Sequence, residues 1–103
     1  MAQKPSQRPW YMDAMEKRDP EFAQMIGSMM AKVNAPGALD AKTKTLITLA
    51  LDAAGYHRDG VVALSKRARA QGASDAEIWE VIRLAYIVGG FPGLTTGLAA
   101  FEG

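Results

Sequence analysis

Residues 39–70 constrain the fold more than any other stretch, because they predict two helices joined by a short polar turn. The first helix, with Asp40 as its N-cap and Gly55 as a left-handed C-cap, is the most uniformly apolar segment of the chain. Its apolar residues cover more than one face, so we expect several neighbours to bury it. The turn from Gly55 to Arg58 holds the chain's one histidine, His57. We expect any reaction centre to lie at this junction.

Helical spacing also occurs on both sides of the turn. Upstream, Asp19 and Pro20 form a strong helix start, and Asn34 with the proline and glycine after it ends that helix. We expect its apolar stripe to pack into the core. Downstream of the turn, a second helix is predicted from Asp59 to just before Gly72. The stripe consists of Phe22, Met25, Ile26, Met29, Met30 and Val33.

The penultimate helix begins at a predicted capping box, Ser74 to Glu77, and ends at a Gly-Gly-Phe-Pro-Gly break over residues 89–93. It is apolar nearly all round, so we expect the chain to form homo-oligomers through it. A last short helix follows. No stretch alternates with period two, so the sequence predicts an all-α bundle of about five to six helices over residues 19–103. Residues 1–18 are predicted to be an N-terminal arm or tail.

Composition excludes several classes of function. The 103 residues carry a net charge of +1, which gives no reason to expect nucleic acid. The chain has no cysteine, which excludes thiol chemistry, and no metal-ligand spacing or phosphate loop, so we expect no metal and no cofactor. The N-terminus lacks an apolar signal region, and the longest apolar run, 81–88, contains Arg83. We therefore expect a cytoplasmic protein with no membrane partner.

The residues around the turn suggest proton transfer. His57 is the candidate general acid or base, with Asp52 or Asp59 to orient it, and Arg58 with Tyr56 as candidate substrate-binding residues. Two simpler interpretations stay open at this point. His57 would also be favourable merely as a cation at a helix C-terminus, and Asp52 would be acceptable as a solvated residue.

Residues 68–81 offer a rival from another class, because their spacing matches a helix-turn-helix DNA-binding module. A small residue at 68 and a glycine turn at 72 precede apolar anchors on a second helix. The first turns of that helix, however, carry Asp75, Glu77 and Glu80, which would face the phosphates of DNA. This charge pattern disfavours the rival.

The order of motifs resembles one family. The run Leu39-Asp40-Ala41-Lys42-Thr43-Lys44-Thr45-Leu46-Ile47 is similar to the start of the conserved region in the carboxymuconolactone decarboxylase family, which includes alkylhydroperoxidase D. The Asp19-Pro20-Glu21 helix start, the Gly72 to Ile78 segment and Gly89-Gly90-Phe91-Pro92 fit the same pattern. The resemblance implies an all-helical, alkylhydroperoxidase D-like fold that assembles as trimers or hexamers.

The resemblance also shows where this chain departs from its relatives. His57 and Gly60 stand where the peroxidase branch has its two cysteines, Leu64 stands at the histidine and Thr45 at the glutamate. Peroxidase activity by the thiol mechanism is therefore excluded. The expectation is a diverged, carboxymuconolactone decarboxylase-like lyase or isomerase acting on a small organic acid or lactone. The alternative is a non-catalytic oligomer that binds a ligand or serves as an assembly protein.

Overall fold

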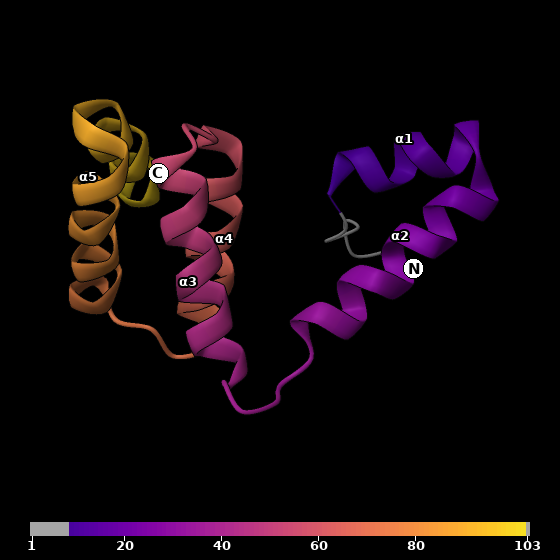
Figure 1. Ribbon diagram of the computed structural model, residues 1–103, viewed down its shortest axis with the longest axis horizontal. Coiled ribbons are helices and arrows are strands. Elements are labelled where there is room, and N and C mark those ends of the chain that lie inside the picture. Colours follow the sequence, from indigo (N-terminus) through magenta and orange to yellow (C-terminus); the bar gives the residue numbers. More distant parts are fainter. Residues whose placement is uncertain (1–8, 103) are drawn as a thin grey trace, which may run out of the picture. The chain divides into compact units, whose positions relative to one another are not determined.

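The computed structural model describes residues 9–102, and every regular element in that range is helical (Figure 1). These residues divide into two compact units, with the division between Ala35 and Pro36. The prediction of an all-α fold is confirmed, with five α-helices and one short 3-10 helix among the described residues. The predicted boundary after residue 18 remains a prediction.

The first unit is a pair of helices, α1 (Trp10–Arg18) and α2 (Pro20–Asn34). Asp19 caps α2 as predicted, since its side chain accepts a hydrogen bond from Phe22 N, and Pro20 occupies the first turn. The part of the predicted arm that the structure describes thus contains a helix, whereas residues 1–8 lie outside the described range. Trp10 contacts Tyr11 edge to face but is 76% exposed.

The second unit is a bundle of α3 (Ala41–Ala54), α4 (Arg58–Ala70) and α5 (Asp75–Gly97), closed by the 3-10 helix Leu98–Phe101 (Figure 1). α3 packs against both other helices, as its apolar surface predicts. The core draws on every element of the unit. Its fully or nearly fully buried residues are Leu49, Ala53, Val61, Ala68, Ala73, Ile78, Ile82, Ala85, Ala99 and Ala100.

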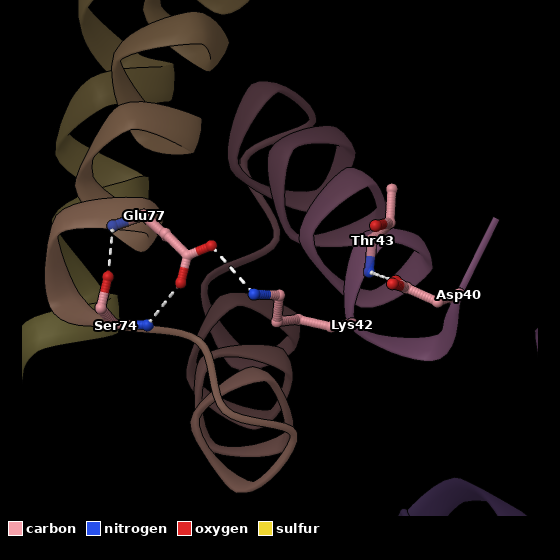
Figure 2. Close-up of polar contacts among 5 residues, drawn as sticks. All are labelled: Asp40, Lys42, Thr43, Ser74 and Glu77. Carbon is pink, nitrogen blue, oxygen red and sulfur yellow. Dashed lines mark hydrogen bonds and ion pairs between the residues drawn. The ribbon is translucent and has the colours of Figure 1, made fainter.

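Polar contacts fix the helix starts on one end of this bundle (Figure 2). Ser74 and Glu77 form the predicted capping box, with bonds of 2.9 and 3.1 Å between side chains and backbone N–H groups. Asp40 accepts a 2.8 Å bond from Thr43 N at the start of α3. Lys42 Nζ lies 3.0 Å from Glu77 Oε2 and so ties α3 to α5. The capping box and the α3 cap are both confirmed.

Two of these carboxyl groups titrate at lower pH than usual. The pKa of Glu77 is lowered first by the hydrogen bond from the Ser74 backbone and then by Lys42. The pKa of Asp40 is lowered by hydrogen bonds from the Thr43 hydroxyl and backbone N–H. Both groups therefore favour the folded state when ionised.

Several predicted details need correction. The left-handed residue after α3 is Tyr56, with φ of 66°, whereas Gly55 has φ of −89°. α4 begins at Arg58, one residue before the predicted Asp59. The predicted break after α5's first part is confirmed at Gly90, whose φ of 68° and ψ of −164° interrupt the helix. The residues after it form a further helical segment that continues into the 3-10 helix.

The first unit by itself leaves four of the six residues of the predicted α2 stripe exposed, whereas Ile26 and Met30 are partly buried. Phe22, Met25, Met29 and Val33 are 48%, 63%, 57% and 64% exposed. α5 also presents apolar side chains outward, among them Leu84, Ile87 and Val88. Residues 75–101 form a helical segment long and apolar enough to cross a membrane. The core helix of a soluble protein meets the same criteria of length and composition. Assembly through α5 remains a prediction.

Candidate functional site

The junction between α3 and α4 has a specific backbone geometry. Tyr56 N donates to Ala53 O at 3.2 Å, and His57 N donates to Asp52 O at 2.8 Å. These two bonds, with Tyr56 in the left-handed conformation, form a Schellman motif at the end of α3. In this motif the second residue beyond the cap lies over the third-last residue of the helix. The fold therefore places His57 directly over Asp52.

The two side chains meet in a hydrogen bond. His57 Nδ1 lies 3.0 Å from Asp52 Oδ1, and the side chains are 66% and 26% exposed. Because a carboxylate only accepts hydrogen bonds, this contact places the ring hydrogen of neutral His57 on Nδ1. Nε2 then carries a lone pair, which faces away from Asp52. This is the arrangement of an oriented imidazole base.

Two glycines leave room for this pair. A methyl carbon at Gly60 would lie 2.7 Å from Asp52 Cγ and closer still to Oδ2, so the carboxylate rests against the bare backbone of α4. A methyl carbon at Gly55 would lie 3.0 Å from His57 Cε1 and 3.3 Å from Nδ1. Gly60 thus permits the close approach of Asp52 to His57. In the peroxidase branch that the sequence resembles, this position holds a cysteine.

The other candidate residues are engaged elsewhere. Tyr56 Oη donates to Gly89 O at 3.1 Å and connects the junction to α5 just before its break. Arg58 forms an ion pair with Glu102, and both side chains are more than half exposed. No sequence pattern indicated a role for Glu102, and Gly60 stood out only as the position of a cysteine in the peroxidase branch. Only the fold brings the C-terminal residues near the start of α4.

Asp59, the second candidate orienting acid, is exposed on the first turn of α4. Within residues 9–102 no hydrogen bond or ion pair joins it to His57. Of the two carboxylates left open by the sequence, Asp52 is therefore the one in contact with the imidazole. Two open surface hollows lie elsewhere, one lined by Glu21, Gln24, Met25 and Ser28 and the other by Glu80, Arg83, Leu84 and Ile87.

Residues that could have offered other chemistry are tied into the helices. The buried Ser65 hydroxyl donates to Val62 O at 2.9 Å, so it points along its own helix. The buried Thr45 hydroxyl donates to Ala41 O at 3.0 Å. Leu64 packs against the core. In the range 9–102, no group of three or more His, Cys, Asp or Glu side chains lies close enough together to hold a metal ion.

Comparisons with known proteins agree with the architecture. The model of the carboxymuconolactone decarboxylase family matches residues 20–103. A solved structure, the apo form of a carboxymuconolactone decarboxylase family protein from Legionella pneumophila, superposes with a TM-score of 0.82 at 29% sequence identity. The match covers 89% of this chain and 82% of that one. No curated protein matches the sequence.

Proposed function

The chain belongs to the carboxymuconolactone decarboxylase family, and we propose that its His57–Asp52 pair transfers a proton on a small organic acid or lactone. The observation that carries this proposal is the 3.0 Å contact between His57 Nδ1 and Asp52 Oδ1. An imidazole held in one tautomer by a carboxylate is a suitable general base near neutral pH. Thiol peroxidase chemistry is excluded because the chain has no cysteine.

The proposed chemistry uses the lone pair on His57 Nε2. In an isomerisation, Nε2 takes a proton from a carbon next to a carbonyl group, and the electron pair of that C–H bond moves into the conjugated system. The imidazolium, stabilised by Asp52, then returns the proton to another carbon of the same system. In a decarboxylation, the C–C bond breaks, CO₂ leaves, and the protonated His57 supplies the proton to the remaining carbanion.

Substrate binding would use the neighbouring cation. Arg58 is suited to hold a carboxylate with two parallel hydrogen bonds. Its present partner is Glu102, and both side chains are largely exposed. A substrate carboxylate would therefore have to replace Glu102, and Glu102→Gln should strengthen substrate binding. Tyr56, whose hydroxyl is bonded to Gly89 O, would line the same site.

The test uses small carboxylic acids and lactones in D₂O. Deuterium incorporation next to the carbonyl group reports proton abstraction by NMR, and release of CO₂ reports decarboxylation. The proposal expects His57→Gln and Asp52→Asn to lower the rate by about 100-fold or more, in the range of general acid–base catalysis. Asp59→Asn is the matched control, because it changes an exposed acid beside the pair without touching it.

A non-catalytic binding protein is the second candidate. The 66% exposure of the His57 side chain favours it, because general bases act best where water is excluded. Under that alternative, ligands would bind and shift the His57 signals while His57→Gln left no reaction to lose. Turnover that is unchanged in His57→Gln would also contradict the proton-transfer proposal. Family membership favours a soluble protein, and a cytoplasmic location is part of the proposal.

A further inference from the structure

Tyr56 has a strained backbone beside the His57–Asp52 pair. Its φ of 66° is the only positive φ at a residue other than glycine within residues 9–102. A Cβ atom makes this left-handed conformation unfavourable, so a bulky aromatic residue rarely adopts it. Strain of this kind persists only where surrounding contacts hold it in place, and it gathers at functional sites. The contacts of Tyr56 therefore indicate what the strain maintains.

The strained conformation determines where His57 lies. Because the chain turns back at Tyr56, Tyr56 N donates to Ala53 O at 3.2 Å. His57 N donates to Asp52 O at 2.8 Å, and His57 Nδ1 lies 3.0 Å from Asp52 Oδ1. With an ordinary negative φ at Tyr56, the chain would not turn back over α3, and both contacts of His57 with Asp52 would be lost. The orientation of the imidazole therefore depends on the conformation of Tyr56.

The Tyr56 side chain anchors this turn to α5. Its hydroxyl donates a 3.1 Å hydrogen bond to Gly89 O, 33 residues along the chain. The acceptor is firmly placed, because a methyl carbon built at Gly89 would lie 2.8 Å from Ala54 Cα and 3.0 Å from Ala54 O. Glycine there brings the backbones of α5 and α3 into close contact two residues before Tyr56. The phenol thus bonds to a carbonyl that is held in place by packing against the same helix end.

We propose that Tyr56 is a positioning residue for His57: its hydroxyl, bonded to Gly89 O, holds the left-handed turn that sets the imidazole against Asp52. The proposal rests on the proton-transfer function above, whose general base is this oriented imidazole. It assigns Tyr56 a role that differs from the substrate contact expected from the sequence. Glycine at position 56 would adopt the same φ without strain, but it would leave the turn without an anchor on α5.

Removal of the hydroxyl sets the size of the effect. One hydrogen bond typically changes an equilibrium constant about 2- to 10-fold in favour of the bonded state. In Tyr56→Phe the turn should therefore open about 2- to 10-fold more often. The His57 amide, which the turn bonds to Asp52 O, should lose the same factor of protection from hydrogen exchange. The neutral ring should also lose part of its preference for hydrogen on Nδ1.

A second substitution separates strain from anchoring. Tyr56→Gly also lacks the hydroxyl, but in this variant the left-handed conformation no longer has a steric cost. That cost corresponds to a factor of about five or more in an equilibrium constant. Protection of the His57 amide should therefore be higher in Tyr56→Gly than in Tyr56→Phe by about fivefold or more. If the bulk of the side chain were all that mattered, the shorter glycine would lose more protection, not less.

The test uses the full chain without substrate. NMR follows hydrogen exchange at the His57 amide and the tautomer of its ring nitrogens in the native chain, Tyr56→Phe and Tyr56→Gly. Tyr86→Phe is the matched control, because it removes the hydroxyl of a similarly exposed tyrosine on the same unit, and it should leave both readouts unchanged. Because neither readout needs turnover, a native chain without any reaction would count against the proposed function alone.

Lost protection and a weaker tautomer preference in Tyr56→Phe, with protection regained in Tyr56→Gly, would support the proposal. Unchanged protection in Tyr56→Phe would overturn it. Protection that falls while the tautomer stays native would also overturn it, because the hydroxyl would then stabilise the turn without positioning the ring. Weaker binding of small carboxylates by Tyr56→Phe with both readouts native would identify Tyr56 as a substrate-binding residue instead.

Discussion

Gly60→Ala is the substitution that tests most sharply how the site is positioned. Alanine in a helix is ordinarily more favourable than glycine by about 0.5–1 kcal/mol. At Gly60, however, the added methyl carbon would lie 2.7 Å from Asp52 Cγ and closer to Oδ2. Ordinary contact begins near 3.4 Å, so the carboxylate must move away. Its bond to His57 Nδ1 would then be lost.

The magnitude follows from these opposing effects. The exposed His57–Asp52 bond contributes at most about 1 kcal/mol, and displacing the carboxylate adds a steric cost. We expect Gly60→Ala to lower the free energy of unfolding by about 1 kcal/mol in the native chain. In an Asp52→Ala background the carboxylate is absent, so Gly60→Ala should raise the free energy of unfolding by about 0.5–1 kcal/mol. The double-mutant cycle should therefore show a coupling of about 1.5–2 kcal/mol.

Urea unfolding of the four proteins measures this coupling. Gly27→Ala is the matched control, because its methyl carbon would meet Met12 Cε at an ordinary 3.5 Å inside α2, so it should stabilise. Gly60→Ala should also reduce proton transfer about as much as Asp52→Asn does. If Gly60→Ala stabilises the native chain as much as it stabilises Asp52→Ala, the steric reasoning is refuted.

Two further predictions concern stability. Glu77 and Asp40 have pKa values lowered from 4.5 and 3.8, so their stabilising effect is full above those values and is lost as pH falls through the lower folded-state pKa values. Urea unfolding should therefore show Glu77→Gln to be less stable than the native chain at pH 7, with the difference shrinking as the pH falls below the ordinary Glu pKa of 4.5; a difference that does not change with pH would contradict this. Ile82 is fully buried in the core of the second unit, so Ile82→Ala should lower the free energy of unfolding by about 2–5 kcal/mol. Ile87 is exposed, so Ile87→Ala should lower it by under about 1 kcal/mol by the same method.

Structural features that depend only on residues close together in the sequence were predictable. Asp19 and Asp40 cap their helices, and Ser74 with Glu77 forms the capping box, because each depends on residues within three positions of one another. Gly90 interrupts α5 at the glycine-rich segment for the same local reason. The all-α fold follows from helical spacing throughout the chain.

The site was only partly predictable. His57 and Asp52 were candidates, but their contact depends on Tyr56 taking the left-handed conformation that glycine usually adopts. Assigning that conformation to Gly55 shifted the motif by one residue, so the superposition of His57 on Asp52 was missed. The contacts from Tyr56 to Gly89 and from Arg58 to Glu102 join residues 33 and 44 positions apart, and local patterns carry no signal for them.

The exposed apolar surfaces show a second limit of sequence patterns. The stripe of α2 has the spacing of a buried face, and the pattern alone does not say which surface covers it. A face that packs into the chain's own core and a face that binds another copy have the same periodicity. The exposure of Phe22, Met25 and Met29 becomes visible only when the first unit is folded.

The most direct test of the proton-transfer account is the NMR spectrum of the His57 ring nitrogens, which is unambiguous because the chain has one histidine. At a pH where the ring is neutral, the account predicts hydrogen on Nδ1 and a lone pair on Nε2, with Nε2 shifting when a small carboxylate or lactone is added. In Asp52→Asn the preference for this tautomer should decrease. A native ring that favours hydrogen on Nε2, or one that does not respond to any of these ligands, would contradict the account.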